Sequence, residues 1–106
     1  MIGLLMLAAV QQPTSMTGND LYGFCQQTYV SGSYACLAYV LGARDMHNEL
    51  VSRGAIRPSF CPGPEVTPSQ QKDAVAAFLL RHPEKREQSA PSLVIEAMAD
   101  SFPCPK

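Results

Sequence analysis

The sequence predicts an all-α fold: a small domain of four helices, arranged as two antiparallel helical hairpins and stapled by two disulfides. Apolar residues recur at helical spacing between recognisable helix caps and breakers, and no segment of useful length shows the alternation of a strand. The chain also has 4 cysteines in 106 residues. Such a density is typical of small domains in an oxidising compartment, which need cross-links because their cores are small.

The first ten residues, MIGLLMLAAV, are an uncharged apolar run followed by polar residues. This pattern is typical of the apolar region of a signal peptide, with cleavage expected after Ala9, and the run is too short to span a bilayer as a resident helix. It lacks the Lys or Arg that normally comes first, so a truncated signal peptide and an N-terminal helix of the folded protein both stay open. We expect residues 1–16 to be a signal peptide and polar leader, and the protein to be secreted.

The first helix is expected over residues 20–27. Asn19 and Asp20 stand at its start, and either side chain can accept a hydrogen bond from the free amides of the first turn. Helical spacing places Cys25 on the apolar side of this helix. The sequence Ser31-Gly32-Ser33 is expected to break the chain before the second helix.

The second helix is expected over residues 33–52 and is ended by Gly54. Its interior Gly42 indicates either a close helix crossing or a tolerated surface position. His47 is expected on a polar stretch. The predicted apolar stripe consists of Tyr34, Leu37, Ala38, Leu41 and Leu50.

The third helix has the clearest boundaries in the chain. Thr67 is a cap residue, Pro68 suits the first helical position, and Gln70 stands where a capping box needs it. Pro83 ends the helix. Its predicted buried stripe is Ala74, Val75, Phe78 and Leu79.

The fourth helix follows a charged connection, residues 83–88. Ser89 is its expected cap, and Pro91 lies in the permissive first turn. The helix is terminated by the Pro103-Cys104-Pro105 sequence. Its predicted stripe is Leu93, Val94, Ala97, Met98 and Phe102.

Four cysteines allow three pairings, and the sequence alone does not choose among them. The expected helices favour Cys25–Cys36, which face each other across a tight hairpin. They also favour Cys61–Cys104, because antiparallel third and fourth helices bring the start of one near the end of the other. The chain-entropy model gives about 3 kcal/mol for the first bridge and about 4 kcal/mol for the second.

Composition and motifs argue against several kinds of function. The net charge is -1, and the Lys and Arg residues are scattered along the chain, so the sequence predicts no basic surface that would bind nucleic acid. A thiol nucleophile would need a free cysteine beside His47 or His82, whereas an even cysteine count in a secretory context favours disulfides. The spacings fit no common zinc pattern, and phosphate-binding and Gly-x-Ser-x-Gly motifs are absent. We expect no enzyme activity, no metal and no cofactor, and instead a protein that binds another protein.

Several short segments stand in a characteristic order: GNDL at 18–21 followed by Cys25, ACLAYVLG at 35–42, CP at 61–62, VT at 66–67 through Gln71, HPE at 82–84, LV at 93–94 through Ala97, and FPC at 102–104. In this order and spacing they resemble the Rap/Tai family, the immunity proteins of type VI secretion amidase effectors. Two departures leave the partner open. Ala38 stands where the pattern usually has Gly, and residues 48–60 are individual to this chain.

The resemblance implies a periplasmic, helical immunity domain over residues 17–106 that binds a peptidoglycan-cleaving amidase and blocks its active site, with no membrane association. Family members without an adjacent effector also exist, so the resemblance alone does not establish immunity. It also implies a homodimer. Apolar residues outside the predicted stripes, Val40, Met46 and Val51, are consistent with a contact between two copies.

Related immunity proteins plug the amidase with a protruding loop, and the resemblance places that loop at residues 83–88. We therefore expect Glu84, Lys85, Arg86 and Glu87 to bind the partner, because a short loop stiffened by Pro83 costs little entropy to present. The alternative is that residues 83–88 form an ordinary solvated turn. The partner contact would then lie on the third helix or on residues 48–60.

The competing hypothesis is a small periplasmic helical chaperone or stress protein of the acid-chaperone type. Such a protein must expose apolar surface at low pH, and this chain has only 2 His with which to sense acid mildly.

Overall fold

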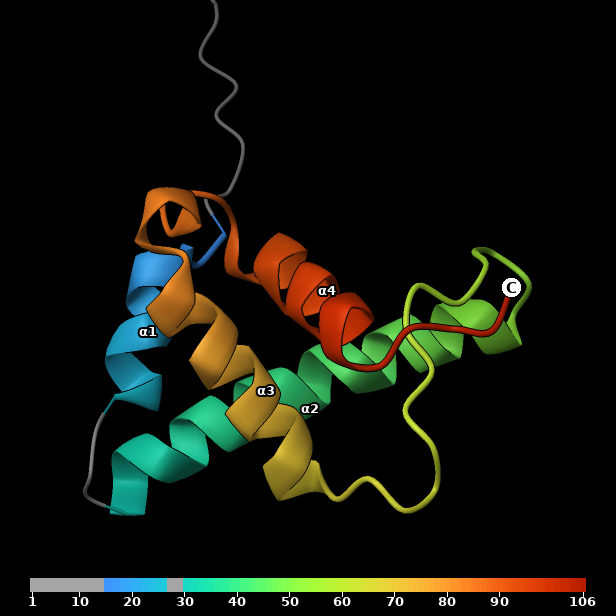
Figure 1. The fold of residues 1–106 in the computed structure, drawn as a ribbon, viewed down its shortest axis with the longest axis horizontal. Coiled ribbons are helices and arrows are strands. Elements are labelled where there is room, and N and C mark those ends of the chain that lie inside the picture. The colour runs from blue at the N-terminus through green and yellow to red at the C-terminus, as the bar shows by residue number, and fades with distance from the viewer. Residues whose placement is uncertain (1–14, 27–29) are drawn as a thin grey trace, which may run out of the picture.

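The computed structural model describes residues 15–26 and 30–106 and confirms the all-α class (Figure 1). It contains α1 (Gly18–Cys25), α2 (Val30–Ser52), α3 (Pro68–Arg81) and α4 (Ala90–Ser101), with the short 3-10 helix η2 (Pro83–Lys85) between the last two. The described part of the chain has no strand, only an isolated bridge between Thr17 and Ser89. The expected signal peptide and polar leader, residues 1–16, lie outside the described residues except for residues 15 and 16, and so does the expected cleavage after Ala9.

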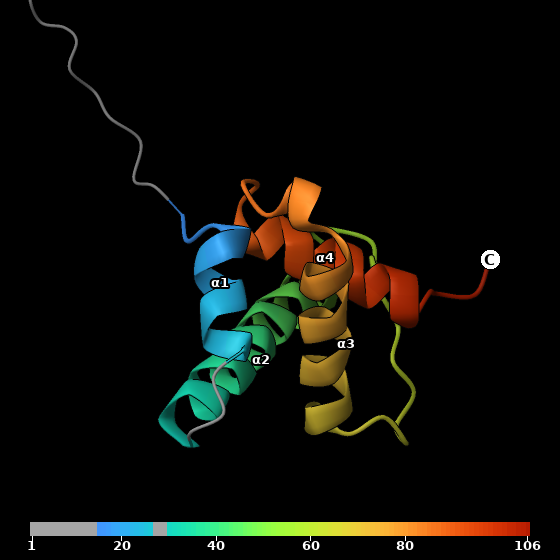
Figure 2. The same ribbon diagram turned by 60° about the vertical axis from the view of Figure 1, so that its left-hand side comes forward.

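The long helix α2 is the element against which the other three helices pack (Figures 1 and 2). Consecutive helices turn back on one another, α1 on α2 and α3 on α4, and the contact between α3 and α4 is the most extensive. The C-terminal segment then runs alongside the end of α2 and the loop that follows it (Figure 1).

Both disulfides join the predicted partners. Cys25 is bonded to Cys36 and Cys61 to Cys104, with Cα–Cα distances of 4.9 and 4.8 Å. No cysteine is free. A thiol nucleophile is therefore not available in this state of the protein.

The start of α1 differs from the prediction. Thr17, rather than Asn19 or Asp20, is the cap, and the helix begins earlier than expected. The Asp20 amide donates to Thr17 Oγ1 at 3.2 Å, and the Thr17 amide donates to the Asp20 carboxylate at 3.0 Å. Asp20 therefore contributes to capping from inside the first turn, as the third residue of a capping box.

The predicted capping box of α3 is confirmed. The Gln70 amide donates to Thr67 Oγ1 at 3.1 Å, and the Thr67 amide donates to Gln70 Oε1 at 2.8 Å. Ser89 caps α4 through the Ser92 amide, although at a longer distance of 3.4 Å.

The prediction of a chain break at residues 31–33 is wrong, because α2 already begins at Val30 and continues through them. Gly32 lies one helical turn before Cys36, and both are buried. The bridge from Cys36 to Cys25 draws this side of α2 against α1, and a residue without a side chain permits that approach.

The predicted apolar stripe of α2 is also wrong. Tyr34 is 65% exposed and Ala38 is exposed, while the buried positions are Cys36, Val40 and His47. The disulfide sets the rotation of this helix, so that the face containing Cys36 turns inward. The three leucines of the predicted stripe are half-buried: Leu37, Leu41 and Leu50. Gly42 is a tolerated surface position, since a Cβ there would meet nothing within 4 Å.

The core lies mainly between α3 and α4, where the predicted stripes are largely confirmed. Its buried members on these helices are Val75, Phe78, Leu79, Ala90, Leu93, Val94, Ala97 and Met98. Leu21, Val40 and Phe60 complete it from α1, α2 and the long loop. Ala74 and Phe102, both predicted as core, are half-buried.

Candidate partner-binding site

The charged connection between α3 and α4 lies against the start of α1 (Figures 1 and 2). Three main-chain hydrogen bonds hold it there: Gly18 N–H to Gln88 O at 2.8 Å, Asn19 N–H to Arg86 O at 2.8 Å, and Ala90 N–H to Met16 O at 2.7 Å. Because backbone groups make these bonds, they do not depend on which side chains the loop carries.

Gly18 makes this docking possible. A Cβ added there would lie 2.9 Å from both the Cα and the carbonyl oxygen of Arg86, and it would collide with the side chain of Leu93. The sequence shows a glycine at the start of a helix but not what lies beside it, so this role was missed.

The two cations of the loop are turned toward the protein. Lys85 is hydrogen-bonded and ion-paired to Glu96 of α4, and its Nζ lies 5.7 Å from the centre of the Phe78 ring. The hydrogen bond to Glu96 is the largest cause that raises the pKa of Lys85. The guanidinium carbon of Arg86 lies 3.8 Å from the centre of the Tyr22 ring on α1, a cation–π contact.

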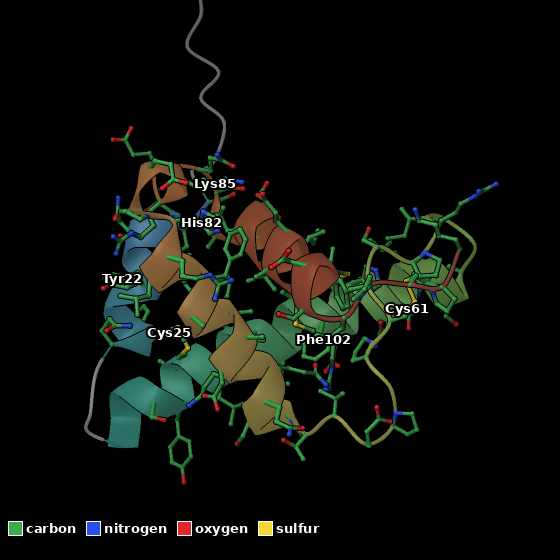
Figure 3. The ribbon with its side chains drawn as sticks, viewed as in Figure 1. Tyr22, Cys25, Cys61, His82, Lys85 and Phe102 are labelled. Atoms are coloured by element: carbon green, nitrogen blue, oxygen red, sulfur yellow. A yellow bond between two sulfur atoms is a disulfide. The ribbon has the colours of Figure 1, made fainter. Side chains whose placement is uncertain are left out.

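The two carboxylates of the loop face solvent instead. The side chain of Glu84 is 63% exposed, with Oε2 3.0 Å from His82 Nδ1, and Glu87 is also exposed. The hydrogen bond with His82 is the largest cause that lowers the pKa of the Glu84 carboxyl. Figure 3 shows His82 and Lys85 at the end of the molecule where α1 begins. The loop therefore presents two acidic groups, whereas the sequence suggested that both charge signs would be available.

A second surface is apolar and lies on α2 and α4. Two adjoining hollows, of about 430 and 160 Å³, share Ala43, Met46 and Pro91 in their walls. Met46 is 61% exposed, and Ile56 and Ile95 are each 40% exposed beside it.

This surface revises the residues considered for a contact between two copies. Met46 lies on it. Val40 is fully buried in the core and cannot contact a partner, while Val51 is half-buried and lines a different hollow.

Two other features would point to a different function, a metal-binding site and a membrane-spanning helix. Among residues 15–26 and 30–106, no three His, Cys, Asp or Glu side chains are grouped so that they could hold a metal ion. No helix in this part of the chain has the length and apolar character needed to cross a membrane.

The family profile of the Rap1a immunity proteins matches residues 17–104. The chain belongs to this family, which confirms the resemblance found in its segments and indicates an immunity protein that binds a secreted effector. No curated protein and no solved structure matched the chain significantly.

Proposed function

We propose that this protein is a periplasmic immunity protein that binds and inhibits a peptidoglycan amidase effector of a type VI secretion system. The family match over residues 17–104 carries the proposal, because immunity proteins protect the producing cell by binding its effector. Two disulfides suit the oxidising periplasm. In this proposal residues 1–16 are the signal peptide and leader, and residues 17–106 are the immunity domain. The family match favours immunity over the chaperone hypothesis.

Inhibition by binding requires no catalytic group. All four cysteines are in disulfides, so no thiol nucleophile is available. We therefore expect the purified protein to leave peptidoglycan fragments intact. Cleavage that disappears when a histidine is substituted would contradict this.

The loop at residues 83–88 is the proposed contact with the amidase. Its backbone is already held by α1, so that little conformational entropy is lost on binding. The exposed Glu84 and Glu87 would attract a basic rim around the partner's cleft and speed the encounter.

The proposed contact is tested with the double substitution Glu84→Gln and Glu87→Gln, which removes both outward charges and leaves Lys85 and Arg86 in place. We expect the association rate with the cognate amidase to fall roughly tenfold at low salt, with weaker inhibition. Surface plasmon resonance at two salt concentrations measures the rate.

The matched control is Asp45→Asn with Glu65→Gln, an equal change of charge at exposed positions outside this loop, α3 and residues 48–60. Circular dichroism checks that both variants keep their helices. An unchanged dissociation constant with undiminished inhibition would place the contact on α3 or on residues 48–60.

We also infer a homodimer, which the family resemblance implies and for which the surface around Met46, Ile56 and Ile95 offers apolar area. Light scattering should give the dimer mass at micromolar concentration. Met46→Lys should shift it toward the monomer, and Leu80→Lys, at an exposed leucine on α3, should not. A monomer mass for the unaltered protein would contradict the inference.

A further inference from the structure

His47 is a buried histidine that holds the loop after α2 against that helix. It is only 4% exposed. Its ring is stacked on Phe60, with 3.9 Å between the ring centres and an interplanar angle of 19°. Its Nε2 atom lies 2.9 Å from the backbone nitrogen of Ser59. The sequence suggested a polar stretch here, and the burial of this side chain was missed.

The hydrogen bonds determine where the ring carries its proton. A backbone amide can only donate, so His47 Nε2 must be unprotonated to accept from Ser59. The ring proton is then on Nδ1, which lies 3.0 Å from the side-chain oxygen of Asn48. The bond from Ser59 requires an unprotonated Nε2, whereas the bond to Asn48 requires only a proton on Nδ1 and persists when the ring is charged.

We propose that His47 is a pH-sensitive latch: protonation of Nε2 in acid removes the acceptor for the Ser59 amide and releases residues 56–60 from α2. Two donors would then face each other across 2.9 Å, and the amide would lose its partner.

The Phe60 ring and the Asn48 oxygen contact the His47 ring, but the walls of the hollows beside it contain no carboxylate that would neutralise its positive charge. The hollows on either side of His47 are walled by neutral residues such as Val51 and Pro58 on one side and Leu50 and Ile95 on the other. The only further ionisable residue type in these walls is Cys61, which is in a disulfide.

On the elements packed around the ring, most charged side chains are paired with one another, as Glu49 is with Arg53, and Glu65 of the loop is exposed to solvent. Arg44 of α2 is paired with Asp45, and Glu96 of α4 is paired with Lys85. Arg57 on the loop itself is exposed and cationic. A buried cation without a carboxylate partner is costly, so the protonated ring and residues 56–60 should separate.

The part that moves is limited by firm contacts on both sides. The Ala55 amide donates to Leu50 O at 2.9 Å, and the Cys61 amide donates to Phe102 O at 2.8 Å beside the disulfide. Between these ends, the bond from Ser59 to His47 is the one hydrogen bond that a backbone amide makes in this stretch of the structure. Release should therefore enlarge the hollow of about 340 Å³ between His47, Pro58 and Phe60.

The latch is tested on the intact, disulfide-bonded protein by nuclear magnetic resonance. At neutral pH, the nitrogen shifts of His47 should show a proton on Nδ1. The hydrogen-exchange protection factor of the Ser59 amide, corrected for intrinsic exchange, should fall about tenfold between about pH 7.5 and 5, the loss expected for one hydrogen bond. The Gly18 amide, which donates to Gln88, should show no such fall.

Two variants distinguish the release at His47 from a general destabilisation of the protein in acid. His47→Phe keeps a ring to stack on Phe60 but has no acceptor, so Ser59 should be poorly protected at both pH values. His82→Gln removes the other histidine and should leave the response unchanged. Wild-type Ser59 protection that stays constant down to about pH 4.5, or a neutral ring with its proton on Nε2, would overturn the proposal even if His47→Phe fails to fold. Since no partner is used, the outcome is independent of the proposed immunity function.

Discussion

The two connections that flank α3 are held in place in different ways. Residues 82–89 are short and docked by main-chain hydrogen bonds to the start of α1. Residues 53–67 are longer. Main-chain hydrogen bonds secure Ala55 and Cys61, but side chains also hold this loop: the Cys61–Cys104 bridge, the buried Phe60 and the His47 ring. A loop docked through its main chain should tolerate changes in most of its side chains, whereas the long loop depends on the side chains of a few residues.

This difference predicts which substitutions each connection should tolerate. On the short loop, Glu84 and Glu87 are exposed and can be replaced without disturbing its path. On the long loop, a change at Phe60 or Cys61 removes part of what keeps the loop folded. Substitutions in each connection and in the residues that contact it can test the contrast between main-chain and side-chain contacts.

The largest effect is expected from the long loop. Replacing Cys61 and Cys104 with Ala should lower the free energy of unfolding by about 4 kcal/mol, because this bridge closes the longer segment, with a sequence separation of 43. The same change at Cys25 and Cys36, separated by 11, should cost about 3 kcal/mol. Urea unfolding of both double variants at low temperature measures the difference. A larger cost for the Cys25–Cys36 pair would mean that local packing outweighs loop length.

On the short loop, the sensitive position should be the glycine that contacts it. Gly18→Ala should lower the free energy of unfolding by about 1–3 kcal/mol, since its Cβ would press on the Arg86 backbone at 2.9 Å and collide with Leu93. The control is Gly23→Ala in the same helix. A Cβ there meets nothing within 4 Å, and the change should stabilise the protein by about 0.5–1 kcal/mol. Thermal unfolding of the two variants gives the comparison, and equal behaviour would remove the argument for close docking at Gly18.

The smallest effect should come from a loop side chain. Hydrogen bonding to His82 lowers the pKa of Glu84 in the folded protein from its ordinary 4.5. Its contribution to stability should therefore be present above the unfolded pKa and be lost as pH falls through the folded value. The stability difference between wild type and Glu84→Gln should be constant near neutral pH and shrink in acid. Urea unfolding at a series of pH values measures it, and a difference that grows in acid would contradict the sign.

Local signals predicted much of the fold. The capping box of α3, the prolines that bound α3 and α4, and the apolar stripes of those helices depend on residues close together in the sequence. The disulfide pairing followed from the expected helix directions and is confirmed. The candidate site was less predictable, because the orientation of Lys85 and Arg86 depends on Glu96 and Tyr22, which belong to other helices.

The sequence by itself determined the helical class, the need for cross-links and the family, since composition, periodicity and motif order are properties of the chain. The tertiary structure alone decided which face of α2 is buried, that Gly18 contacts the loop and that His47 is covered by Phe60. The physical reason is that tertiary contacts set the rotation of each helix about its axis and bring together residues that are distant in the sequence. A helix can turn any of its faces inward until a remote contact, here the bridge from Cys36 to Cys25, selects one, and no local pattern encodes that selection.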